Sequence, residues 1–314
     1  MIYNEGEILK LVEVAKMYYE ENMTQANIAK SLKVSRPLIS KMLTKARELG
    51  IVHIEIKSPY TNNTFLANQL KSLFNLQEGI ITPQANTEYL TEQLILTHAF
   101  HYIEDILNKI NYLGIGCGYE IEALMKKIES STILQNFQGE ICPLIGSASI
   151  PNRGYHPNEI VRAFSQKTGG TPHYIFAPAF PTTKEEQDLY LHTDNYHSIF
   201  KTWSILDTVL VSIDTYPSVP DQATALRFGR SLHDRKAVGM ILSYYFDKSG
   251  NIIKGKNDYA IHIPLEKIKK IKRVIGICTN SNNIYSIIGA LRTGLITHLI
   301  TDEKTASNII KNQT

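Results

Sequence analysis

The sequence has no apolar run near the ~20 residues that a membrane-spanning helix needs. Its first ten residues, MIYNEGEILK, lack the apolar core of a signal peptide. These two absences predict a cytoplasmic protein with no membrane partner.

Cysteine is scarce as well, since Cys117, Cys142 and Cys278 are widely spaced and odd in number. No CxxC or Cys/His spacing of a zinc site occurs, and the ten histidines include no HExxH motif. The sequence therefore predicts no disulfide framework and no metal site, with His98 and His101 on a helix surface. We expect the cysteines to be small buried residues, although Cys117, which precedes a predicted helix, could have a lowered pKa.

Charge of one sign is lacking overall, because the net charge of the 314 residues is only +3. The basic residues are therefore concentrated locally. This argues against a protein that coats DNA and favours one that docks on DNA through a single face. The length suggests two domains, and an apolar content of 43% with 17 tyrosines allows a large core.

Acidic residues are absent from residues 24–47, TQANIAKSLKVSRPLISKMLTKAR, which hold six Lys or Arg. The stretch is typical of two short helices joined by a tight turn. In its second half the apolar positions fall on one helical face: Leu38, Ile39, Met42, Leu43 and Ala46. Polar and basic positions, with one proline, fall on the opposite face: Arg36, Pro37, Ser40, Lys41 and Thr44. This pattern predicts a helix-turn-helix whose second helix enters the DNA major groove.

Capping residues support these boundaries. Thr24 and Ser35 are placed to cap the two helices, Pro37 falls in the first turn of the second, and Gly50 follows its end. Residues 51–56 alternate like a short strand, which is a plausible wing.

Contact with operator DNA is expected from both helices of the motif. The predicted DNA-binding residues are Thr24, Gln25, Ser35, Arg36, Pro37, Ser40, Lys41, Thr44 and Lys45. The alternative is a three-helix bundle with a solvated basic face, in which i,i+4 Glu–Lys pairs would be expected. The acid-free face favours DNA binding.

The remainder of the chain alternates helical segments with short apolar runs. A polar, turn-rich stretch at residues 58–63 predicts a linker between a domain of residues 1–57 and one of residues 64–314. The apolar runs are residues 112–116, 141–146, 174–177, 208–213, 273–277 and 298–301. Such runs predict an α/β fold with a Rossmann-like parallel sheet between helices.

Several of these runs end in glycine or small polar residues, where ligands bind in open α/β sheets. Glycines such as Gly116, Gly118 and Gly146 would let backbone amides approach an anion, which suggests a phosphate-bearing metabolite. The GxGxG of residues 114–118 matches neither the GxGxxG nor the P-loop spacing, so glycines needed only for tight turns remain the alternative.

Four segments together resemble the SorC family of transcriptional regulators, which includes deoxyribonucleoside, central glycolytic and autoinducer-2 operon repressors. They are the helix-turn-helix, FAPAFPTTKEEQ, KAVGMILSYYFDKSGNII and RVIGICTNSNNIYSIIGALRTGLITHLITDEKTA. The resemblance implies a winged helix-turn-helix followed by a sugar-binding domain related to sugar-phosphate isomerases and deaminases. It also implies a phosphorylated sugar as effector and a homo-oligomer, usually a dimer of dimers.

The sequence departs from the family pattern at four places around the implied pocket. Thr279, Asn280 and Asn283 replace a Gly-Gly and a following Lys, and Met240 replaces an Asp. Tyr119 and Glu120 replace a hydroxyl residue, and Ser212-Ile213-Asp214 replaces a Gly-Ile-Gly. Either the ligand differs from an ordinary sugar phosphate or the pocket has lost its ligand.

A regulator of a carbohydrate-related operon, controlled by a sugar or sugar phosphate, is the function that these patterns favour. The expected effector-binding residues are Gly116, Gly118, Tyr119, Gly146, Ser147, Met240, Asn280 and Asn283. One alternative is a regulator whose sheet domain serves only assembly or partner binding. An isomerase-like enzyme is disfavoured because Met240 and Asn283 offer no useful acid or base, so no catalytic residue and no cofactor is expected.

Overall fold

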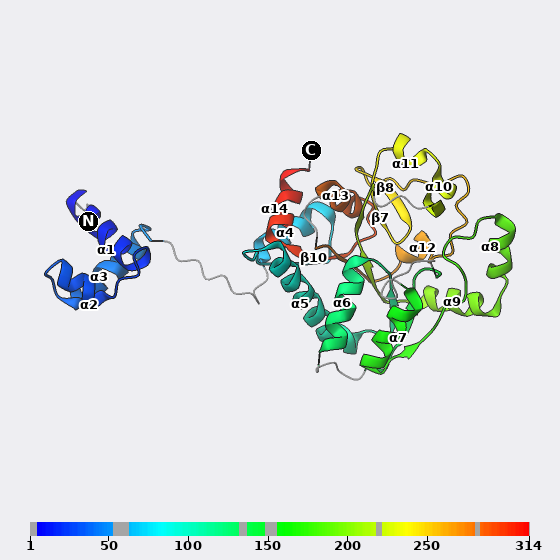
Figure 1. The fold of residues 1–314 in the computed structure, drawn as a ribbon, viewed down its shortest axis with the longest axis horizontal. Coiled ribbons are helices and arrows are strands. Elements are labelled where there is room, and N and C mark those ends of the chain that lie inside the picture. The colour runs from blue at the N-terminus through cyan, green and yellow to red at the C-terminus, as the bar shows by residue number, and fades with distance from the viewer. Residues whose placement is uncertain are drawn as a thin grey trace. The chain divides into compact units, whose positions relative to one another are not determined.

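The computed structural model describes residues 5–52, 63–131, 137–147, 156–217, 222–279 and 283–313. The chain divides into two compact units, Met1–Lys57 and Ser58–Thr314, each with its own buried core (Figure 1). Among the described residues, none of the helices is both long and apolar enough to cross a membrane.

The first unit consists of three helices, α1 (Glu5–Tyr19), α2 (Gln25–Ser31) and α3 (Arg36–Glu48). They enclose a small core in which Val14 of α1, Ile28 of α2 and Ile39 of α3 are almost completely buried. Thr24 caps α2, because its hydroxyl accepts a 3.2 Å hydrogen bond from the Asn27 amide. Ser35 is the N-cap residue of α3 but makes no such side-chain bond.

The two helices of the motif are joined by a tight turn in which Lys33 has a φ of 54°. The predicted apolar stripe of α3 is correct except for Leu38, which is 43% exposed. Leu38 is 100° from Ile39 around the helix, and α1 and α2 pack only around the arc centred on Ile39 and Leu43. Gly50 has a positive φ of 71°, as expected after a helix end. Of the predicted wing, Ile51 and Val52 pack on the core, and residues 53–56 lie outside the described residues.

The second unit is built on a parallel sheet of seven strands in the order β1-β10-β9-β5-β2-β3-β4. The strands are β1 (Glu78–Thr82), β2 (Tyr112–Ile115), β3 (Glu140–Pro143), β4 (Thr171–Pro172), β5 (Thr208–Ser212), β9 (Arg273–Ile277) and β10 (His298–Asp302). The predicted α/β class with a parallel sheet is confirmed. Its central strand β5 is buried at every position, which is why its sequence is apolar without alternation.

Helices cover both faces of this sheet (Figure 1). One face is covered by α5 (Glu88–Ile106), α6 (Tyr119–Ser130) and α7 (Pro157–Thr168), and the other by α4 (Thr64–Phe74), α9 (Asp194–Ile205), α13 (Ile284–Arg292) and α14 (Glu303–Lys311). Shorter helices are η1 (Leu107–Lys109), α8 (Lys184–Leu191), α10 (Gln222–Phe228), α11 (Ser231–Asp234) and α12 (Leu265–Ile268). The two layers bury separate apolar clusters, which fixes the sheet in the middle.

A second, antiparallel sheet contains β6 (Asp214–Thr215), β7 (Ala237–Ile241) and β8 (Tyr244–Asp247). The sequence analysis did not predict it. Its first strand follows β5 after a single residue, and Asp214 pairs with Met240. This sheet therefore brings Met240 next to the carboxyl end of β5.

The strand predicted at residues 174–177 is wrong, since the short β4 ends at Pro172. The backbone at 174–176 bonds to side chains in place of a neighbouring strand. The Asn158 side chain accepts a hydrogen bond from the Ile175 amide and donates one to the Ile175 carbonyl. The Asn195 side chain accepts from the Phe176 amide and donates to the Tyr174 carbonyl. Because the amides of Ile175 and Phe176 are hydrogen-bonded in this way, the apolar run does not need to pair with a neighbouring strand. The edge strand β1 was also not predicted.

Candidate functional site

The outward face of α3 is exposed at Arg36, Pro37, Ser40, Lys41 and Thr44, which is the face predicted to contact DNA. Its polar groups are not equally available. The Thr44 hydroxyl accepts a 3.3 Å bond from Arg47, and Lys45 forms an ion pair with Glu48 at 3.0 Å.

Thr24 and Gln25, at the start of α2, lie beside this face. They line a shallow surface hollow together with Arg36 and with Tyr18, Tyr19, Asn22, Met23 and Ala26. The structure thus brings Thr24 and Gln25 together with Arg36, whereas the other predicted DNA-binding residues do not line this hollow. The aromatic side chains of α1 that border the hollow were not among the predicted residues.

At the carboxyl ends of the parallel strands, a cavity of about 550 Å³ opens between the loops that follow β1, β2, β5, β9 and β10. We call it the acidic cavity, because five carboxylate residues and one lysine line it: Glu88, Glu92, Glu120, Asp214, Asp302 and Lys304. The other lining residues are Gln84, Tyr89, Thr91, Tyr119, Ile213, Thr215 and Thr279. Its position follows the general rule for ligand sites in open α/β sheets.

Glu120 is a deeply buried carboxylate of the acidic cavity, with only 5% of its surface exposed. Its Oε1 accepts a hydrogen bond from the Thr279 hydroxyl at 3.2 Å, whereas Oε2 is buried and has no partner among the described residues. Burial raises the pKa of Glu120, and the nearby hydroxyls of Ser212 and Thr279 partly offset that effect.

Asp214, the first residue of β6, also lines the acidic cavity. Burial, and secondly the charge of Glu120, raise the pKa of Asp214 to about 8. Asp302, in contrast, already accepts two bonds from Thr305 as the cap of α14. Glu120 therefore keeps a buried oxygen without a partner among the described residues, whereas the carboxylate of Asp302 is already bonded.

The loop after β2 depends on glycine for steric reasons. Gly118 has a φ of 137°, and a Cβ at this position would lie 2.4 Å from Ser212 Oγ. At Gly116 a Cβ would lie 2.9 Å from Leu242, and at Gly146 it would lie 2.6 Å from the Pro178 backbone. Gly116 and Gly146 therefore allow close packing of neighbouring chain segments, a reason that differs from both the anion contact and the tight turns considered from the sequence.

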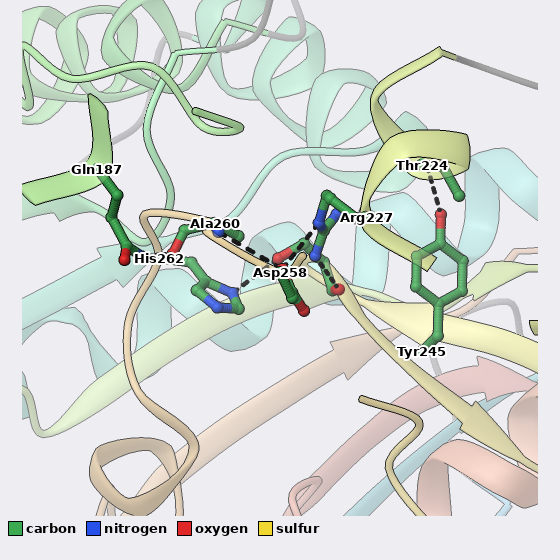
Figure 2. A network of polar contacts seen from close by, with 8 residues as sticks. Gln187, Thr224, Arg227, Tyr245, Asp258, Ala260 and His262 are labelled. Atoms are coloured by element: carbon green, nitrogen blue, oxygen red, sulfur yellow. Dashed lines mark hydrogen bonds and ion pairs between the residues drawn. The ribbon is translucent and has the colours of Figure 1, made fainter. Parts of the chain in front are cut away.

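A second cavity, of about 660 Å³, lies on the other side of the β2 loop and is more apolar. It contains Cys117, Gly146 and Met240, together with Phe180, Leu226 and Arg227. Figure 2 shows the network beside it: Arg227 binds Asp258 at 2.8 Å and the Ser243 carbonyl at 3.1 Å, and Tyr245 bonds Thr224 at 3.2 Å. Ser243 also bonds His262 at 2.7 Å. The charge of Arg227 is thus already paired.

The predicted effector-binding residues are consequently divided between two cavities. Tyr119 lines the acidic cavity, whereas Gly146 and Met240 line the second one. Ser147 lines neither of them and bonds the Ala177 carbonyl instead. Asn283 is the N-cap residue of α13, and Asn280 lies outside the described residues.

Sequence reasoning did not identify most of the acidic lining. Asp302 and Lys304 directly follow a run that was recognised as a strand, so the strand-end rule could have found them. Gln84 follows β1, which was not predicted, and Glu88 and Glu92 come from the next helix. No sequence signal pointed to these three.

The suggestion of a lowered pKa at Cys117 is wrong, because burial raises the pKa of this thiol to about 12. Its loop places it against apolar side chains. His98 bonds the Leu94 carbonyl within its helix, and His101 is exposed beside Glu104. Within the described ranges, no cluster of three potential metal-ligating side chains occurs.

Residues 58–311 match the family model described as "Putative sugar-binding domain". Over 98% of its length the chain is 28% identical to the sorbitol operon regulator of Klebsiella pneumoniae, of which it covers 99%. It is also 24% identical to the deoxyribonucleoside regulator of Bacillus subtilis, over 96% of this chain and 97% of that protein. The crystal structure of the full-length Klebsiella regulator SorC superposes with a TM-score of 0.72 at 26% identity, over 98% of this chain and all of that one.

Proposed function

The chain belongs to the SorC family, whose sugar-binding domain model matches residues 58–311, and on this basis we propose that it is a DNA-binding transcriptional regulator of a carbohydrate-related operon. Residues 1–57 bind operator DNA, residues 58–63 link the domains, and residues 64–314 bind the effector and assemble the oligomer. The relatives named as regulators match over almost the whole chain, so the sequence similarity extends over both domains.

The observation that supports DNA binding best is the composition of the exposed face of α3. Arg36 and Lys41 are exposed on it, residues 24–47 hold no acid, and Arg36 lines a hollow with Thr24 and Gln25 at the start of α2. A helix of this width fits one major groove, where arginine can make two bonds to guanine. Because Lys45 is paired with Glu48, we assign it to the phosphate backbone, where a diffuse charge suffices.

Control by a small molecule is supported by the acidic cavity, whose volume of about 550 Å³ suits a monosaccharide-sized ligand. We further propose that the protein has no enzymatic activity. The second cavity contains Met240 where an ionisable residue would be needed, and His262, which does not line this cavity, is bonded to its lining residue Ser243. The relatives' names likewise describe regulators.

A second candidate is a regulator whose sheet domain serves assembly alone. Large apolar side chains favour an assembly role, since Phe65, Phe176 and Leu189 are each at least 69% exposed. This candidate differs from the first only in that the sheet domain has no ligand.

The proposed function is tested by fluorescence anisotropy of the full chain with promoter DNA from its own gene neighbourhood and with random duplex. We expect the promoter site to bind at least about 10³-fold more tightly. The double variant Arg36→Ala/Lys41→Ala should lose this preference. The control Lys10→Ala/Lys16→Ala removes the same charge from exposed positions of α1 and should keep the preference. Equal binding of promoter and random DNA by the natural protein would refute the proposal.

A further inference from the structure

The charged residues that line the acidic cavity are mostly acidic, which disfavours the anionic ligand that the glycine-rich loops suggested. Five carboxylate residues and a single lysine, Lys304, line it. Lys304 is exposed on α14, whereas Glu120 is buried. A phosphate group in this cavity would lie near carboxylates without a buried cation to balance it, and at low dielectric that repulsion is costly.

The unsatisfied groups of the cavity are acceptors. Two lining residues carry a buried oxygen with no partner among the described residues: Glu120 Oε2 and Gln84 Oε1. Buried polar atoms of native proteins are nearly always bonded, so a missing partner points to a ligand. That partner must donate hydrogen bonds. A phosphate offers mostly acceptors, whereas a protonated amine offers three donors.

Neutral polar groups surround the carboxylates. Thr215, Thr279 and Tyr119 are hydroxyl residues that also line the cavity, and Tyr119 donates a 2.8 Å bond to Glu92. Hydroxyl and amide side chains are suited to a ligand that has several hydroxyls of its own. The cavity is therefore polar around Glu120 and Asp214, a coupled pair of carboxyl groups in which Asp214, with a pKa of about 8, holds a proton at neutral pH.

We propose that the acidic cavity binds a small polyol that carries a protonated amine, such as an amino sugar or an amino polyol, with the ammonium between Glu120 and Asp214. The inference rests on the proposed function only in taking this molecule to be the effector. The ammonium donates to Glu120 Oε2 and to the Asp214 carboxylate, and the hydroxyls of the ligand bond Gln84, Thr215 and Thr279.

Asp214 and Glu120 are suited to this role as a pair. Their mutual repulsion, which burial strengthens, is relieved when a cation lies between them. Binding of the ammonium then favours the ionised form of Asp214, so a proton leaves the protein as the ligand enters.

The test is isothermal titration of the full chain with two matched series of probes. The first is D-glucosamine, D-glucose and D-glucose 6-phosphate, and the second is 1-amino-1-deoxy-D-sorbitol, D-sorbitol and D-sorbitol 6-phosphate. We expect an amine to bind in at least one series, at least about tenfold more tightly than the neutral sugar, and the phosphate to bind most weakly. The measured heat should depend on the ionisation enthalpy of the buffer, because a proton is released.

Two variants remove a charge without changing shape, Glu120→Gln and Asp214→Asn. Each should weaken amine binding by about tenfold or more and narrow the difference between amine and neutral sugar. The control Glu185→Gln changes an exposed acid of α8, which does not line the cavity, and should bind as the natural protein does. Thermal unfolding of each variant confirms that it is folded before the titration.

Tighter binding of a phosphate than of its amine, or amine binding that neither cavity variant weakens, would overturn the inference. So would the absence of amine binding in both series. Anisotropy with promoter DNA separates the two claims. A protein that prefers its promoter but binds no amine refutes this inference alone, and one that binds the amine without any promoter preference refutes the proposed function alone.

Discussion

Asp214 and Glu120 share the wall of the acidic cavity, and burial together with the charge of Glu120 raises the pKa of Asp214 to about 8. Glu120 lies in the first turn of α6, whereas Asp214 is the first residue of β6 in the second sheet. Their coupling has a consequence for stability that can be measured without any ligand.

Stability should fall as the pH rises towards 8. An unfolded aspartate has a pKa of about 3.9. Between about pH 4 and pH 8 the folded protein therefore holds a proton on Asp214 that the unfolded chain has lost, and the free energy of unfolding decreases. Asp214→Asn removes this titration, so its Tm relative to that of the natural protein should rise from about pH 5 to about pH 9. Calorimetry checks it, and a constant difference across this range would contradict it.

Arg36→Ala should weaken promoter binding by about 1–3 kcal/mol, because a bidentate contact to guanine would be lost. Lys45→Ala should weaken promoter and random DNA about equally and reduce the salt dependence, since its proposed contact is to phosphate. Anisotropy titrations at two salt concentrations measure both effects. Unchanged promoter binding by Arg36→Ala would refute the docking of α3.

Thr24→Ala should lower the free energy of unfolding of the first unit by about 1 kcal/mol, because the Thr24 hydroxyl caps α2. Ser35→Ala is the matched control, since Ser35 makes no side-chain cap bond and should cost less. Urea denaturation of both variants, followed by circular dichroism, gives the comparison. A larger loss in Ser35→Ala would show that the caps are assigned wrongly.

Gly118→Ala should destabilise the second unit more than Gly50→Ala destabilises the first. Gly50 has open space around its missing Cβ, so alanine there meets only the strain of a positive φ, about 1 kcal/mol. At Gly118 the new Cβ would also overlap Ser212 Oγ. The variant should thus distort the wall of the acidic cavity and lose amine binding. Normal stability and binding in Gly118→Ala would contradict this geometry.

A fragment of residues 58–314 should form a dimer or tetramer without the first unit. One helix-turn-helix per chain reads a useful length of DNA only as an oligomer, and the second unit has its own core and exposed apolar side chains. Light scattering at micromolar concentration measures the mass. A monomeric fragment would place the assembly contacts in the first unit.

Local features were predictable because they depend on neighbours in the sequence. The helix boundary at Thr24, the positive φ at Gly50 and the buried stripe of Ile39 and Leu43 follow from capping, backbone freedom and helical period. The strands β5 and β9 were recognisable because both of their faces are covered, which makes their sequences continuously apolar.

Other features were decided only in three dimensions. Tyr174–Phe176 reads as a strand, but side chains of Asn158 and Asn195, distant along the chain, bond its backbone. Leu38 belongs to the apolar stripe by period, yet no helix packs over its side of α3.

The candidate ligand site shows the same division. By itself the sequence determined that small and polar residues follow the parallel strands, including Glu120 and Asp214 at positions unlike the family pattern. The tertiary structure decided that these two carboxylates face one cavity, whereas Gly146 and Met240 face another. The physical reason is that the second sheet pairs Met240 with Asp214 of β6, yet Met240 lines the second cavity and Glu120 lines the acidic one. Which loops share a cavity depends on the strand order of the sheet and on how the connections cross over it. The periodicity of apolar residues along the sequence predicts neither of these.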